Sequence, residues 1–476
     1  MAQVRALRYS PRMIKHTRIG PASFYKGALS IAVPVMLQGL IQNLVSLIDN
    51  FMVAGLGDTK MSGVNVTNQI IFVLFVALMT LMSAGGMFMS QFNGAKDSEG
   101  MRQTFRFKIH TSSMLALLSV LLTLILPRQI LGVLLNTNTE AEAIIKEGSA
   151  YLSIIVFTFF PIAWAMAIGS SLREIGKVRA PLVISVAATG VNTFFNWVLI
   201  YGNLGAPRLE VKGAAYATLI ARLFELAVFI IYLQVTRPAF FVRLTELWKV
   251  NLKLFTTILG KSGFIFLSEM SWVLTETVMT AVYNGRGGSE IVSGMAAGWA
   301  IANVFFLVFH GIHVSTGVIV GGTLGKNELD LAQTQARWIR TGAIVAGGAL
   351  AFVLAASIGL IPIVYGNLSD GARVVTRSML IAIACYFPLW TYLNAQFATA
   401  RSGGDAIMGM WVDGVVNLTM FLPGIFLLAA FTDLGPIAMY AIVKLTDVVK
   451  VAIAAWQLRK GRWVRNLAQE HAPGGA

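Results

Sequence analysis

Two glutamates stand in one long apolar stretch, "GFIFLSEMSWVLTETVMTAVY", where each of them could exchange a cation. Glu269 and Glu276 are two helical turns apart, so both would lie on the same face of a helix. Burial in an apolar medium disfavours the charged form of a carboxylate, which allows such a group to take up and release a proton. We predict that Glu269 is the main ion-coupling carboxylate and that Glu276 lies near the outer end of the same helix. A hydrogen-bonded structural role for Glu269 is the alternative.

Asp49 is the second candidate for ion coupling. It follows an uncharged run that begins at residue 27, and it would lie about 30 Å along a helix that rises 1.5 Å per residue. This places Asp49 in the outer part of a membrane span, either as an exchangeable acid or as a helix-end residue in contact with water. Three further polar residues could line a cavity: Gln42, Asn68 and Gln69.

Two cations in apolar runs are each followed by an acid three residues later. The pairs are Arg222 with Glu225 and Lys444 with Asp447. Side chains at this spacing are neighbours on a helix surface, so each pair can neutralise itself. We predict structural ion pairs that stabilise helix packing; an ion-relay role is the alternative. Asp413, in "MWVDGVV", is predicted to accept hydrogen bonds on the cytoplasmic side.

The composition indicates that these side chains are positioned by membrane-spanning helices. Hydrophobic residues make up 56% of the 476-residue chain and charged residues only 12%, whereas about 25% charged residues is usual for soluble domains. A helix needs roughly 20 apolar residues to cross a bilayer, and strand-like alternation is absent. We therefore predict an all-α membrane protein with twelve transmembrane helices. The predicted spans are 28–53, 63–89, 107–126, 148–171, 180–203, 212–234, 257–283, 290–320, 341–364, 376–399, 406–430 and 435–457.

The net charge of +15 is distributed in a way that fits a membrane protein. With both termini in the cytoplasm, most of the 37 lysine and arginine residues fall in cytoplasmic segments, Lys108, Arg401 and Lys450 among them, as the positive-inside rule requires. This basic surface predicts contact with anionic lipid headgroups in the plasma membrane rather than with nucleic acid. The single cysteine, Cys385, excludes an internal disulfide and offers no metal cluster.

The sequence contains an internal repeat. "GAAYATLIARLFE" begins at Gly213 and "GPIAMYAIVKLTD" begins at Gly435, and their alignment places each cation–acid pair of one half on that of the other. Other short matches recur at nearly the same offset, so we predict two pseudo-symmetric six-helix lobes with the substrate between them. The predicted parts are a cytoplasmic N-terminal tail (1–26), a first lobe (27–235), an amphipathic cytoplasmic linker (236–256), a second lobe (257–457) and a basic cytoplasmic tail (458–476).

Several stretches resemble the MATE (multidrug and toxic compound extrusion) transporters over essentially the whole chain. They include "LIDNFMVAGLGDTKMSGVNVTNQI", "SLREIGKVRAPLVISVAATGVNTFFNWVLIYGNLG", "VKGAAYAT" and "VGGTLGKNELDLAQ". The resemblance implies twelve helices in two lobes and export of amphiphilic, often cationic compounds. It also implies that entry of H⁺ or Na⁺ drives this export.

The resemblance also implies two sets of site residues, and the sequence departs from both. In one branch of the family a first-helix acid, here Asp49, works with an asparagine and an aspartate of the fifth helix. Asn192 matches the asparagine, but Asn196 stands where the aspartate would be; one turn apart, both amides can still face Asp49. In NorM-like relatives a seventh-helix glutamate lies close to Glu269, but their tenth-helix acid is absent here.

The leading functional hypothesis is therefore a secondary antiporter that exports amphiphilic, cationic small molecules in exchange for H⁺ or Na⁺. We expect it to need no other cofactor, to have no enzymatic activity and to act as a monomer. A flippase for lipid-linked saccharides is an alternative, although it should hold more basic residues in its cavity. An intramembrane transferase would need clustered acid or histidine motifs, which we do not find. A membrane protein with no transport role is the remaining alternative.

Overall fold

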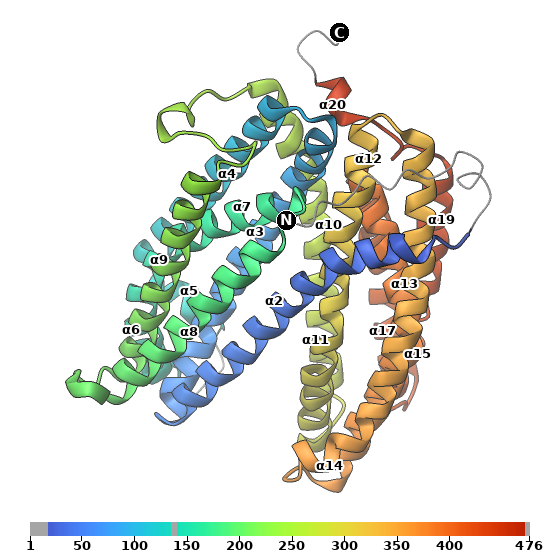
Figure 1. Cartoon of the computed structure of the whole chain (residues 1–476). Helices are drawn as coiled ribbons and strands as arrows, with labels where there is room; N and C mark the ends of the chain where they lie inside the picture. The colour runs from blue at the N-terminus through green and yellow to red at the C-terminus, as the bar shows by residue number, and fades with distance from the viewer. Residues whose placement is uncertain (1–17, 135–139, 472–476) are drawn as a thin grey trace. The chain divides into compact units, whose positions relative to one another are not determined.

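The computed structural model describes residues 18–134 and 140–471, and every regular element within them is helical (Figure 1). An apolar helix satisfies its own backbone hydrogen bonds, which lipid cannot do. The helices are α2 (Ala22–Ala54), α3 (Asp58–Ala95), α4 (Ser98–Ile125), α5 (Pro127–Leu134), α6 (Ala141–Ile155), α7 (Phe159–Glu174), α8 (Arg179–Tyr201), α9 (Glu210–Thr236), α10 (Leu252–Asn284), α11 (Ser289–Thr316), α12 (Gly322–Gly325), α13 (Leu329–Ser357), α14 (Ile361–Val364), α15 (Asp370–Ser402), α16 (Ile407–Gly409), α17 (Leu422–Phe431), α18 (Pro436–Val443), α19 (Thr446–Arg459) and α20 (Leu467–Glu470).

Short segments of other helix types join or interrupt these helices. The 3-10 turns are η1 (Val156–Thr158), η2 (Asn203–Gly205), η3 (Leu244–Glu246) and η5 (Ile358–Leu360), and the π-helical segments are η4 (Gly317–Gly321), η6 (Met410–Val415) and η7 (Asn417–Phe421). η6 and η7 lie between α16 and α17. A π-helical segment widens a helix locally and is frequent at functional sites.

The described chain contains ten helical stretches that are long and apolar enough to cross a membrane. The two other predicted spans are also helical: residues 257–283 lie in α10, which carries Glu269 and Glu276, and residues 435–457 are divided between α18 and α19. The prediction of an all-helical, multi-pass membrane fold is confirmed. The break between α18 and α19 was not predicted, and it falls at Lys444 and Leu445.

Some helices extend beyond the predicted spans. α4 begins at Ser98 rather than at residue 107, because Asp97 caps it: the Asp97 side chain accepts a hydrogen bond of 2.9 Å from the Gly100 amide. Lys108, which the charge pattern places among the cytoplasmic basic residues, lies ten residues after the start of α4. It is fully buried and paired with Glu174 of α7.

The segment between α9 and α10 packs on the N-terminal part of α4. Phe240 is buried against Phe105, with ring centroids 5.1 Å apart, and Arg106 Nε donates to the Glu246 carbonyl oxygen at 3.0 Å. Trp248 of the same segment is 81% exposed. This segment is thus bound to α4, and its exposed side chains include Arg243, Leu244 and Lys249.

The last described residues pack against helix ends rather than extending away from them. Trp463 and Leu467 are buried, and the Leu467 amide donates to Gln91 Oε1 at 2.7 Å. Gln91, at the end of α3, also donates to the Ser402 carbonyl oxygen at 2.8 Å. The described part of the predicted basic tail is therefore an ordered part of the protein.

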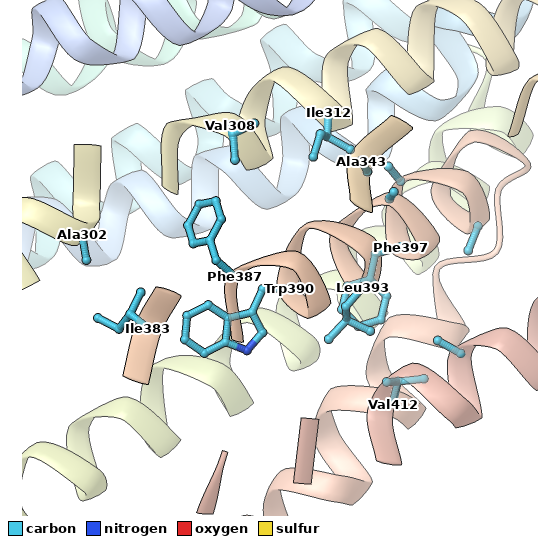
Figure 2. Close-up of a cluster of buried hydrophobic side chains, with 14 of the residues drawn as sticks. Ala302, Val308, Ile312, Ala343, Ile383, Phe387, Trp390, Leu393, Phe397 and Val412 are labelled. Carbon is cyan, nitrogen blue, oxygen red and sulfur yellow. The ribbon is translucent and has the colours of Figure 1, made fainter. Parts of the chain in front are cut away.

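The described chain forms two compact units. The first, here the N-terminal unit, contains residues 37–89, 97–134 and 140–259; the second, here the C-terminal unit, contains residues 18–36, 90–96 and 260–471. The core of the C-terminal unit is centred on α15, which contacts α11, α13 and α19. Ile383, Phe387, Trp390 and Phe397 recur along one face of α15 at helical spacing and fill this core (Figure 2).

Candidate cation-binding sites

The predicted meeting of Asp49 with two amides of α8 is present in the N-terminal unit. Asn196 Nδ2 donates to Asp49 Oδ1 at 2.6 Å. With its amide turned so that the nitrogen faces the acid, Asn192 donates to both carboxylate oxygens, at 3.0 and 3.1 Å. Both asparagines are buried, because they are one turn apart on the face of α8 that packs inward. Asp49 is thus held by neutral hydrogen-bond donors.

Arg222 and Glu225 form a second polar group in the same unit. Arg222 Nη1 is 2.8 Å from Glu225 Oε2, so the predicted pair within α9 is confirmed. The other oxygen of Glu225 accepts from Ser185 of α8 at 3.1 Å, and Ser185 in turn accepts from Gln38 of α2 at 2.8 Å. This chain of contacts joins α2, α8 and α9, which supports the structural role predicted for the pair.

The predicted pair between Lys444 and Asp447 is wrong. Lys444 Nζ is instead 2.9 Å from Glu276 Oε1 on α10. Glu276 reaches the Lys444 ammonium from a separate helix, while Asp447 is engaged by other partners. Asp447 pairs with Lys450 at 3.2 Å and accepts a hydrogen bond of 2.8 Å from Trp390 Nε1.

Glu269 is not an isolated acid. Its Oε1 atom is 2.9 Å from Arg401 Nη2, at the C-terminal end of α15, and 37% of its side chain is exposed. Asp413 lies 3.4 Å from Lys450 and accepts from Ser268 Oγ at 3.2 Å, in keeping with its predicted hydrogen-bonding role. The C-terminal unit thus holds a charge group of four carboxylates and three cations, with one formal negative charge in excess: Glu269, Glu276, Asp413, Asp447, Arg401, Lys444 and Lys450.

The predicted cavity residues do not join these groups. Gln42, Asn68 and Gln69 are exposed, and no hydrogen bond connects their side chains to Asp49 within residues 18–134 and 140–471. The same residues contain no group of three or more His, Cys, Asp or Glu side chains that could hold a metal ion. The oxygen atoms around Asp49 could still bind a single monovalent cation.

Comparison with known proteins shows the family to which the chain belongs. The family model MatE matches residues 34–198 and 265–426, which is more than half of the chain. The chain belongs to the MatE family.

Relatives of this MatE chain extend over nearly its full length. It is 25% identical to a probable multidrug resistance protein NorM of Halalkalibacterium halodurans over 446 residues, 91% of this chain and 94% of the relative. It is 24% identical to a protein of the same description in Thermotoga maritima, over 86% of this chain and 87% of the relative. The crystal structure of MATE in the bent conformation superposes with a TM-score of 0.81 at 18% identity and covers 92% and 95% of the two chains. That likeness confirms the fold.

Several residues of the MatE chain's charge clusters were not identified from sequence. Lys450, Arg401 and Lys108 belong to the basic residues that the charge pattern assigns to the cytoplasmic side, yet each pairs with a buried or half-buried acid. The spacing of Asp447 and Lys450 is a local signal that could have indicated their pairing. The pairs formed by Arg401 and by Lys108 join separate helices and leave no such signal.

Proposed function

We propose that this protein is a secondary active antiporter of the plasma membrane that exports amphiphilic, cationic small molecules in exchange for H⁺ or Na⁺. Membership of the MatE family and relatives described as multidrug resistance proteins support the export of drug-like compounds. The proposal also includes both termini on the cytoplasmic side, as the distribution of basic residues indicates, and a single chain as the working unit.

The observation that carries the exchange mechanism is the environment of Asp49. Of the six candidate carboxylates, all of which lie in the described chain, five have an ion-pair partner within 4 Å and Asp49 has none. Arg222, whose charge acts on Asp49, is itself paired with Glu225. Asp49 is therefore the acid that can accept a cation without first breaking an ion pair.

One amide beside Asp49 also carries an oxygen atom that could serve a bound cation. Asn196 Oδ1 is buried and has no hydrogen-bond partner, although buried polar atoms are nearly always paired. When this amide turns, its oxygen can accept a proton held on Asp49, or it can join the carboxylate as a ligand of a sodium ion. A bound H⁺ or Na⁺ and a cationic drug then compete for one negative charge, which is the simplest basis for exchange. This environment supports Asp49, rather than Glu269, as the main coupling acid in this proposal.

The flippase alternative is less well supported. Recognition of a pyrophosphate requires cations that are free to contact its oxygen atoms. The two deep cations predicted from sequence, Arg222 and Lys444, are each engaged by a carboxylate, at 2.8 and 2.9 Å.

The test is efflux of a fluorescent organic cation from vesicles that contain the full chain, with the proton and sodium gradients collapsed separately. We expect collapse of one gradient to stop efflux, and Asp49→Asn to remove this dependence while the protein level is unchanged. Glu269→Gln is the matched comparison, because it removes an acid that is already neutralised by Arg401. Efflux that continues with both gradients collapsed would contradict the antiporter proposal.

A further inference from the structure

The ammonium group of Lys444 lies among three aromatic rings of the C-terminal unit. Lys444 Nζ is 5.0 Å from the ring centroid of Phe421. It is 5.6 Å from the centroid of Tyr440 and 5.7 Å from that of Trp390. Rings within about 6 Å attract a cation through their negative faces, and clusters of such rings recognise ammonium ligands. We refer to Trp390, Phe421 and Tyr440 as the aromatic cage.

The rings of the aromatic cage are held in place by other side chains. Trp390, which projects from α15 in Figure 2, donates its Nε1–H to Asp447 and stacks on Tyr386 with centroids 5.9 Å apart. Tyr440 contacts Trp299 edge to face, with centroids 6.2 Å apart. Because these contacts do not involve Lys444, Trp390 and Tyr440 keep their positions if the lysine side chain leaves the cage.

The polar groups around the aromatic cage could also contact a bound ligand. Glu276 binds the ammonium at 2.9 Å, and 20% of its side chain is exposed, so it forms the accessible wall of the site. The hydroxyl groups of Tyr440 and Tyr283 are buried without a hydrogen-bond partner, and their rings lie 6.5 Å apart in an edge-to-face contact. A buried tyrosine hydroxyl normally has a partner, so these two atoms point to a ligand that supplies one.

The backbone at Lys444 allows its side chain to move. α18 ends at Val443 and α19 begins at Thr446, so the lysine stands on a joint between two helices. Its side chain is a flexible four-carbon stem. Asp447, whose charge also acts on Lys444, offers a second carboxylate to an ammonium that leaves Glu276. A rotation of the Lys444 side chain can thus carry its ammonium group from Glu276 to Asp447.

We propose that the aromatic cage and Glu276 bind the ammonium group of an amphiphilic amine, free or methylated, and that Lys444 fills this site when no amine is bound. The incoming ammonium takes over the contact with Glu276 and the three ring faces, while Lys444 turns toward Asp447. Binding adds one positive charge beside the charge group of four carboxylates and three cations, which offsets the one excess negative charge of that group. The role of this site in transport rests on the proposed function; its ability to bind ammonium does not.

The first experiment empties the cage in the purified full chain. In Lys444→Ala, n-propylammonium chloride is expected to raise the midpoint of thermal unfolding by several degrees, saturably and relative to equal sodium chloride. The matched control is Lys450→Ala, because Lys450 is also buried in this unit but pairs with Asp413 and Asp447 outside the cage. Adding Glu276→Gln to Lys444→Ala should abolish the rise. An equal response in the Lys444 and Lys450 variants would overturn the assignment of the site.

The second experiment tests displacement in the wild-type protein and needs no variant that has to fold. Lysines are labelled with an amine-reactive anhydride, with and without benzyltrimethylammonium, which has no reactive N–H. We expect the labelled fraction of Lys444, measured by mass spectrometry, to change at least threefold with the probe, because the lysine leaves the accessible Glu276 for the buried Asp447, while that of Lys450 is unchanged. An unchanged Lys444 would show that the lysine stays in the cage and would refute displacement.

These results can be separated from those of the transport experiment. If efflux does not depend on either gradient but Lys444→Ala still binds propylammonium, the antiporter proposal fails and the ammonium site stands. If efflux is coupled but neither the thermal nor the labelling response is found, the cage proposal fails alone, and the substrate cation binds elsewhere.

Discussion

The buried pair of Lys108 and Glu174 allows a quantitative test of how charge is held inside the N-terminal unit. The side chain of Lys108 is fully buried and that of Glu174 is 15% exposed. Lys108 Nζ also donates to Ser170 Oγ at 3.1 Å. Lys108→Met keeps the length of the side chain but leaves the Glu174 carboxylate without this cation. Loss of one partner from a buried ion pair costs about 3–5 kcal/mol, so we expect a loss of that size in the free energy of unfolding.

A double variant tests the reason for this loss. Replacing both members of a buried pair is often nearly neutral, so Lys108→Met combined with Glu174→Gln should recover most of the stability. The control is Arg102→Met on the same helix, because Arg102 and Glu99 form an exposed pair at 3.7 Å. Such pairs contribute about 0–1 kcal/mol.

The assay is denaturant-induced unfolding in mixed micelles, followed by circular dichroism. The reasoning is refuted if Lys108→Met is no more destabilising than Arg102→Met. It is also refuted if the double variant is as unstable as the single one.

Three further outcomes are expected. Asp49→Asn should lower cation-coupled efflux at least tenfold without loss of the folded protein, as measured by vesicle efflux and size-exclusion chromatography; an unchanged rate would assign coupling to another acid. Gly213→Ala should lower the free energy of unfolding by more than about 1 kcal/mol, because its new Cβ would overlap the Leu199 backbone carbonyl group. Gly190→Ala is the control in the same unfolding assay: it has open space around it and should be neutral or stabilising. Gln91→Ala removes the acceptor of the buried Leu467 amide and should lower the free energy of unfolding by about 1–3 kcal/mol. We expect faster hydrogen exchange in the C-terminal segment; unchanged exchange would contradict the packing of Leu467 on Gln91.

Much of the fold could be predicted from the sequence because only helices and closed β-barrels can satisfy their backbone hydrogen bonds in lipid. Long uncharged runs have to satisfy their own backbone groups, so the helical class and the approximate positions of the spans follow directly. The Arg222–Glu225 pair was predictable for a similar reason, since both residues lie on one uninterrupted helix. The meeting of Asp49 with Asn192 and Asn196 needed the family resemblance as well, because spacing alone does not say which helices are neighbours.

The tertiary structure alone decided which cation neutralises which acid between helices. Glu269 with Arg401 and Glu276 with Lys444 each join residues more than a hundred positions apart, and such a choice depends on the rotation and depth of both helices. Lys444 shows most clearly that sequence spacing does not identify the partner of a buried charge. Lys444 stands three residues before Asp447, yet it pairs with Glu276 of another helix, while Asp447 is engaged by Lys450 and Trp390. Sequence therefore determines what each segment is, because that depends on local chemistry and on the solvent, whereas the partner of a buried charge is determined by packing.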